Sequence, residues 1–84
     1  MIKIYDIHYQ ELYKIDGNIV YDYGWRECFR IDKDKNMIYD NLWRERYRID
    51  GNMILDVNWT PRYRIDGNII RDANNWAELY RIER

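Results

Sequence analysis

The sequence predicts an all-β domain: an antiparallel meander of tandem β-hairpin repeats that closes into a symmetric toroid or a small barrel. Three observations support this prediction. One short motif recurs along the chain, each copy is centred on a turn sequence, and apolar and charged residues alternate beside the turn. No segment carries the apolar spacing of an amphipathic helix, so we expect at most one helical turn, at residues 76–80.

The recurring motif reads as a strand, a tight turn and a strand. The segment Tyr13–Asp22 returns as Tyr47–Asp56 and as Tyr63–Asp72, each with Asp-Gly-Asn at its centre. A variant copy, Phe29–Asp40, has Lys33–Lys35 in place of the glycine. Asp-Gly between alternating apolar residues is a strong hairpin signal and predicts a type I′ turn, with positive φ at both central residues. Each copy is therefore a predicted hairpin.

The chain is one domain, residues 1–84, with half of a repeat at each end. We divide it into a half-unit at 1–9, units at 10–25, 26–43, 44–59 and 60–76, and a half-unit at 77–84. The C-terminal strand Leu79–Ile82 can pair with the N-terminal strand Ile2–Asp6 and close a ring. Loop-closure entropy favours pairing within one chain. Pairing between chains would give a homo-oligomer through the terminal strands.

A second connection, Asp-x-x-aromatic, follows each hairpin, with one extra residue in Asp72–Trp76. Aspartate side chains accept hydrogen bonds from backbone amides two residues on and so start turns. The aspartates of this connection are Asp6, Asp22, Asp40, Asp56 and Asp72. Pro61, the only proline, comes directly after one such loop, which suits the first residue of a strand.

The two faces of the predicted strands differ in chemistry. On the first strand of a unit Tyr13 and Ile15 point one way and Lys14 the other, while on the second strand Val20 and Ile19 make both faces apolar. The repeats must therefore cover one another. The cations at the Lys14 position are Lys14, Arg30, Arg48, Arg64 and Arg81. They predict either a ladder of Arg–Asp pairs between neighbours or a cationic ring that converges on an axis and binds an anion.

The recurring Tyr-Arg-Ile-Asp-Gly-Asn-Ile-Ile segment, with its Asp and Trp, resembles the bacterial 4-fold β-flower domain family over nearly the whole chain. The resemblance implies a flower-like ring of hairpin petals in proteins with no established function, and it brings no catalytic residues. The petals would turn at Asp16-Gly17, Asp32–Asn36, Asp50-Gly51 and Asp66-Gly67. The terminal halves add a possible fifth petal, so the sequence leaves open whether the ring contains four hairpins or five.

The tryptophans carry the main functional alternatives. They are Trp25, Trp43, Trp59 and Trp76, one after each full repeat. A tryptophan at a fixed repeat position buries much apolar area, so we expect packing between repeats. The alternative is a set of shallow carbohydrate or other ligand sites, whose affinity would multiply by avidity.

The chain contains few residues that could act as a catalytic nucleophile or base. There is no serine, and His8 and Cys28 are the only histidine and cysteine. His8 occupies a variable loop position and Cys28 a strand position filled elsewhere by Leu12 or Arg46, so we interpret both as structural. Aspartates that recur in every unit share one environment, which does not suit an acid–base pair. The Asp-Gly-Asn segments are not followed by the glutamate that closes a calcium-binding loop. We expect no catalysis, no metal and no cofactor.

Charge and hydropathy limit the partners. The 14 basic and 15 acidic residues nearly cancel, which argues against nucleic acid and an anionic membrane surface. No apolar run resembles a signal peptide, and the single cysteine suits a reducing compartment, so we expect a cytoplasmic bacterial protein. The sequence predicts a non-catalytic structural or protein-interaction module of unknown partner. The alternative is a multivalent, lectin-like module that uses the repeated tryptophans.

Overall fold

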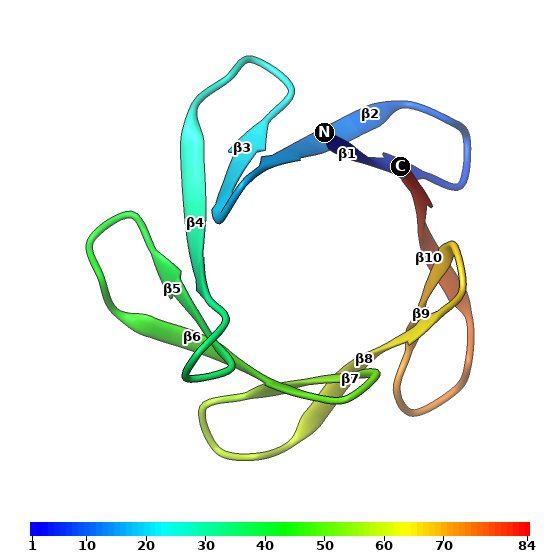
Figure 1. Cartoon of the computed structure of the whole chain (residues 1–84). Coiled ribbons are helices and arrows are strands. Elements are labelled where there is room, and N and C mark those ends of the chain that lie inside the picture. The colour runs from blue at the N-terminus through cyan, green and yellow to red at the C-terminus, as the bar shows by residue number, and fades with distance from the viewer.

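The computed structural model describes all 84 residues and contains strands and turns but no helix. Ten antiparallel strands follow one another as a meander and close into a barrel. The strands are β1 (Ile2–Asp6), β2 (Glu11–Asp16), β3 (Ile19–Asp22), β4 (Glu27–Asp32), β5 (Met37–Asp40), β6 (Glu45–Asp50), β7 (Met53–Asp56), β8 (Pro61–Asp66), β9 (Ile69–Asp72) and β10 (Glu78–Glu83). Figure 1 shows them as a ring seen along its axis, with long loops that project outward. The predicted all-β closed meander is confirmed.

The ring closes between the chain ends. Strand β1 pairs with β10, with Ile4 opposite Ile82 and Tyr5 opposite Arg81. The two terminal halves thus form a fifth repeat, and the ring has five units where the resemblance implies four. Each terminal strand is paired on both sides within this chain, which is the closure within one chain that loop-closure entropy favours.

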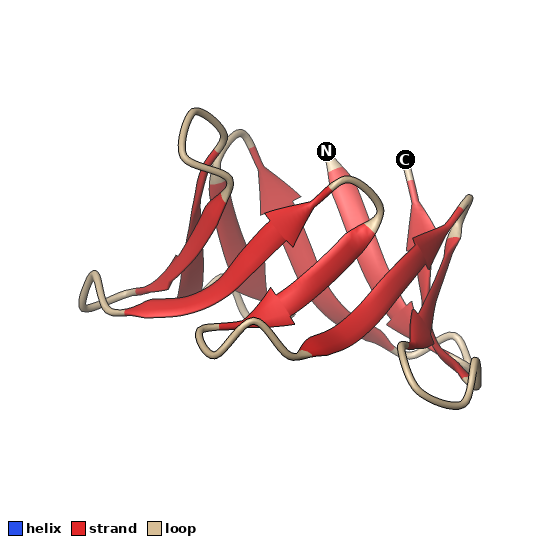
Figure 2. Cartoon of the chain, turned by 90° about the horizontal axis from the view of Figure 1, so that it is seen from below, coloured by secondary structure: helices blue, strands red, loops and turns tan.

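The two ends of the barrel differ in their connections. The connections after β2, β4, β6 and β8 lie at one end together with the termini, and the connections after β1, β3, β5, β7 and β9 lie at the other (Figure 2). We call the first the turn end and the second the loop end. Every pairing next to a loop-end connection contains a register shift, and the pairings across the turn-end connections contain none. Such bulges bend the strands and increase their local twist.

The glycine turns differ from the sequence prediction. Asp16 pairs with Ile19, so the central residues are Gly17 and Asn18, and only Gly17 has positive φ, at 64°. A single positive φ at the first central residue is the pattern of a type II′ turn. The predicted type I′ turn is wrong, because the turn is centred one residue later than Asp-Gly suggests.

The side chains form two apolar layers, one inside and one outside the ring. Residues opposite one another in a ladder share a face, so Ile38 and Tyr47 point into the barrel while Met37 and Arg48 point outward. Ile4 is buried in the interior, and Met37 and Leu55 are buried on the outer face. The predicted second strand with two apolar faces therefore packs on both sides of the sheet. Pro61 begins β8, as predicted.

Candidate functional site

Five similar loops surround the loop end, and each presents an aromatic residue; four have the same length, and the β9–β10 loop has one residue more. We call this set the aromatic rim: Tyr9, Trp25, Trp43, Trp59 and Trp76. Asp22 shows how a loop is built, because its Oδ1 accepts hydrogen bonds from the backbone N–H groups of Gly24 and Arg26, both at 2.9 Å. The Trp25 N–H donates to the Asp22 carbonyl at 3.0 Å. The predicted role of these aspartates in the turn is confirmed.

Each rim residue adopts the left-handed backbone conformation. The φ angles are 62° at Tyr9, 67° at Trp25, 63° at Trp43, 66° at Trp59 and 62° at Trp76. A type I turn followed by a left-handed residue is a standard three-residue hairpin loop, which four of the five loops match in length, and glycine usually occupies the left-handed position. An L-residue there costs about 1–2 kcal/mol. Contacts of the aromatic side chain offset part of this cost.

Those contacts are stacking interactions with the cations of the outer face. Each rim residue lies over the cation from the first strand of the preceding hairpin. The distances to the ring centroid are 4.6 Å for Lys14 Nζ over Trp25, 4.6 Å for Arg30 Cζ over Trp43, 4.5 Å for Arg48 Cζ over Trp59, 4.9 Å for Arg64 Cζ over Trp76 and 5.1 Å for Arg81 Cζ over Tyr9. Such cation–π pairs contribute about 0.5–1 kcal/mol each at exposed sites.

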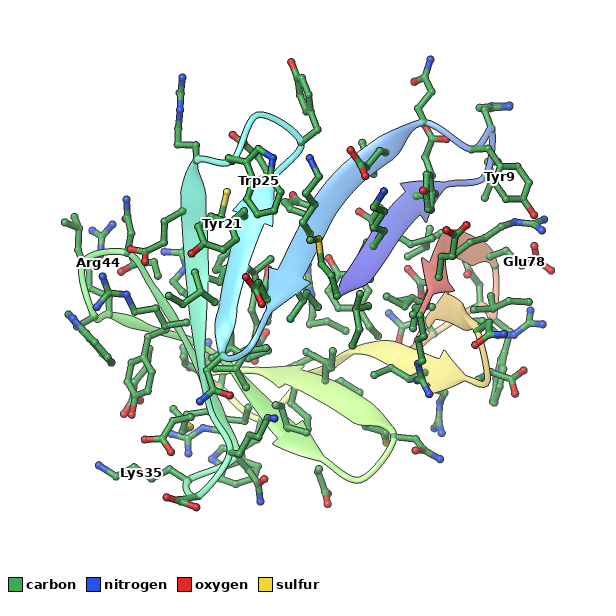
Figure 3. The ribbon with its side chains drawn as sticks, turned by 45° about the horizontal axis from the view of Figure 1, so that its top comes forward. Tyr9, Tyr21, Trp25, Lys35, Arg44 and Glu78 are labelled. Atoms are coloured by element: carbon green, nitrogen blue, oxygen red, sulfur yellow. The ribbon has the colours of Figure 1, made fainter.

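The rim residues remain largely exposed despite this stacking. Between 50% and 63% of each is accessible, and Trp25 lies beside Tyr21 on the outside of the ring (Figure 3). The Tyr21 and Trp25 ring centroids are 5.4 Å apart. The expectation that the tryptophans are buried between repeats is therefore wrong. Each indole packs against the barrel through part of its surface and leaves the rest open to solvent.

Further apolar side chains accompany the rim in the same loops. Ile7, Tyr23, Leu42 and Val57 are exposed by 40% or more, and each lies one or two residues before a rim aromatic. Sequence reasoning missed them because the loop positions vary in type. It also missed Tyr9 as a member of the site, although its spacing from Asp6 is the same as that of Trp25 from Asp22.

The cation ladder does not match either sequence interpretation. Four of its cations pair with a glutamate three residues earlier on the same strand: Arg30 with Glu27 at 2.7 Å, Lys14 with Glu11 at 3.3 Å, Arg81 with Glu78 at 3.4 Å and Arg48 with Glu45 at 3.7 Å. The Arg–Asp ladder is therefore wrong, because the aspartates cap the loops. The converging anion site is also wrong, because the cations lie on the outer face. Pro61 takes the glutamate position in the unit of Arg64.

The lone histidine and cysteine lie apart from any catalytic arrangement. His8 is exposed in the β1–β2 loop, and the Cys28 Sγ donates to the Arg26 carbonyl at 3.5 Å. Burial raises the pKa of the Cys28 thiol, and the nearby Asp22 carboxylate raises this pKa further. An activated thiol needs a lowered pKa. No three His, Cys, Asp or Glu side chains form a group that could hold a metal ion.

Asp40 is the one carboxylate with a clear shift. The backbone N–H of Arg44 lowers the pKa of Asp40, and the Arg44 guanidinium, 2.7 Å from Oδ2, lowers it further. A hydrogen-bonded loop cap accounts for this shift, so it does not indicate a catalytic acid.

The chain matches no known protein family, no characterised protein and no solved structure. No helix of the structure is long and apolar enough to cross a membrane.

Proposed function

We propose that this chain is a non-catalytic binding module that contacts a partner protein through the aromatic rim. One observation carries the proposal. Of the ten large hydrophobic residues that are exposed, nine lie in the five loop-end loops, and the tenth is Met1. Exposed apolar side chains gathered in one region mark interaction sites. Tryptophan, tyrosine and arginine, which compose the rim and its stacked cations, are also the residues that dominate binding energies at interfaces.

The backbone strain supports the same proposal. Glycine would occupy the left-handed position without cost, yet all five loops carry an aromatic residue there. Strained positions are retained where the side chain has a use. The stacked cation holds each ring in one orientation, which reduces the entropy that a partner must overcome on binding.

The test is capture of partners by the immobilised protein and by a variant with Trp43→Ala and Trp59→Ala. We expect the wild-type protein to retain defined partners and the variant to lose them. Lys35→Ala, at the tip of the β4–β5 turn at the opposite end, is the matched control (Figure 3). Equal retention by the rim variant, with its fold confirmed by circular dichroism, would exclude the rim as the interface.

A carbohydrate ligand is the second candidate, and the shape of each site favours it. A ring with one face on a cation and the other exposed can stack on a sugar, and Asn41, Asn58 and Asn74 lie in the same loops as polar groups. A glycan array separates the two candidates. Saturable binding that blue-shifts the tryptophan fluorescence supports carbohydrate, and its absence together with protein capture supports a protein partner.

A further inference from the structure

The barrel interior forms an apolar cavity that is open to solvent and independent of the aromatic rim. Its volume is about 200 Å³. A ring of five aromatic residues lines it: Tyr13, Phe29, Tyr47, Tyr63 and Tyr80. A ring of five aliphatic residues lines it beside them: Ile4, Val20, Ile38, Ile54 and Ile70. Ile15 is the eleventh lining residue, and no charged or polar side chain other than the tyrosines contributes.

The strand number explains why the cavity exists. Eight strands give a barrel interior that side chains just fill, and ten strands give a wider one. The aromatic ring follows the wall instead of crossing the centre, because neighbouring rings pack against each other around it. Phe29 and Tyr47 lie 6.3 Å apart, Tyr47 and Tyr63 6.2 Å, and Tyr63 and Tyr80 6.4 Å, between ring centroids.

We propose that this cavity binds one small uncharged molecule with a single aromatic ring. An enclosed apolar cavity of about 150 Å³ takes up benzene, so an open apolar cavity of about 200 Å³ has room for a molecule of the size of benzene or toluene. Drug-sized ligands need about 300 Å³ or more, so a large polycyclic molecule does not fit inside this cavity. A guest ring can form with the wall the same tilted pairs that the wall residues form with each other.

The surrounding charges argue against an ionic guest. The cations of every unit lie on the outer face, where they pair with glutamates and stack on the aromatic rim. The cavity wall therefore offers no counter-ion, and an ion would lose part of its hydration without compensation. Benzoate, which has the size of toluene and a charge, is the matched probe for this point.

Toluene titration followed by isoleucine methyl NMR tests the proposal on the intact protein. We expect saturable shifts of the methyl signals of Ile4, Ile38, Ile54 and Ile70, which line the cavity. The signals of Ile19 and Ile69, which lie opposite outer-face arginines, should stay in place and serve as internal controls. Benzoate should give no shift, and hexane should bind more weakly than toluene.

Two substitutions at one position sharpen the test. Val20 is the smallest member of the aliphatic ring, and the other members are isoleucines. Val20→Phe fills the cavity and should weaken toluene binding by about tenfold or more, as loss of the apolar space predicts. Val20→Ile, the residue of the other repeats, should keep saturable binding. Four results would overturn the proposal: no saturable shift in the wild-type protein, equal shifts on the outer face, tighter binding of hexane than of toluene, or unchanged binding in a folded V20F variant. Because this readout lies inside the barrel, it does not depend on the partner of the aromatic rim.

Discussion

Both ends of the barrel contain positions with positive φ, and the two ends place different residue types there. At the turn end the left-handed positions hold Gly17, Gly51 and Gly67, with Asn36 in the longer turn. At the loop end all five hold an aromatic residue. A side chain built on Gly51 would meet nothing within 4 Å, so nothing is gained by having one there. Trp59 instead covers Arg48 on the outer face. The difference shows that the loop end keeps aromatic side chains at positions where glycine would avoid the backbone strain.

The largest expected difference between the ends concerns their aspartates. Asp56 begins a loop and accepts from the backbone N–H groups of Asn58 and Thr60, at 2.9 Å and 3.0 Å. Asp50 flanks a glycine turn and its side chain accepts no hydrogen bond. We expect Asp56→Ala to lower the free energy of unfolding by about 1–2 kcal/mol, because it removes an ionic acceptor from two donors. Chemical denaturation measures this change.

Two further variants, Asp50→Ala and Asp56→Asn, serve as controls for Asp56→Ala. Asp50→Ala should change stability by less than about 0.5 kcal/mol, as is usual for an exposed side chain without partners. Asp56→Asn keeps an acceptor oxygen and should fall between the two. Equal costs for Asp50→Ala and Asp56→Ala would contradict the division of roles between the ends.

The next effect isolates the glycine of a turn. Gly51 has φ of 58° and open space around its Cβ position, so an added methyl group meets no clash. Gly51→Ala should therefore cost about 1 kcal/mol from backbone conformation alone. Gly24, whose φ is not positive, is the control at the loop end, and Gly24→Ala should show no conformational cost of this kind. Thermal unfolding of both variants compares them, and a larger loss at Gly24 would contradict the assignment.

Much of this architecture could be predicted from the sequence, and the omissions have physical reasons. The repeats, the closure through Ile2–Asp6 and Leu79–Ile82, and the capping aspartates follow from local patterns that act within a few residues or repeat along the chain. The exposure of Trp59 could not be predicted from such patterns, because period-two alternation applies to strands and Trp59 lies in a loop. The partners of the cations were also missed, since Glu27 and Arg30 straddle a bulge whose position no local pattern predicts.

Replacement of a rim residue should have a smaller effect on stability, and here glycine should be the less destabilising substitute. Trp59→Ala loses the stacking on Arg48 but keeps the strained φ of 66°, so it should cost about 0.5–1 kcal/mol. Trp59→Gly loses the same stacking and relieves the strain, so it should be more stable than the alanine variant by about 1 kcal/mol. Glycine is normally the worse replacement inside a hairpin, which makes the order diagnostic. Equilibrium urea denaturation measures it, and an alanine variant more stable than the glycine variant would show that strain is absent.

The smallest effect at neutral pH concerns the aromatic ring inside the barrel, between the two ends. Burial raises the pKa of Tyr13 and Tyr63, and nearby tyrosines, Tyr80 and Tyr47 among them, raise it further. A raised pKa means that the folded chain holds these protons more tightly than the unfolded chain, whose tyrosines ionise near about pH 10. The stabilisation is therefore fully present below that pH and is lost as the pH rises toward the folded-state pKa.

Phenylalanine variants test this alkaline loss, because Phe29 already occupies the equivalent position in the second repeat. The double variant Tyr13→Phe, Tyr63→Phe should match the wild-type protein at neutral pH to within about 0.5 kcal/mol. Above about pH 10 it should lose stability less steeply, since two groups that favour the unfolded chain on ionisation are gone. Urea denaturation across this pH range gives the slopes. Parallel slopes for the two proteins would show that the phenols of the inner ring ionise as freely in the barrel as in the unfolded chain.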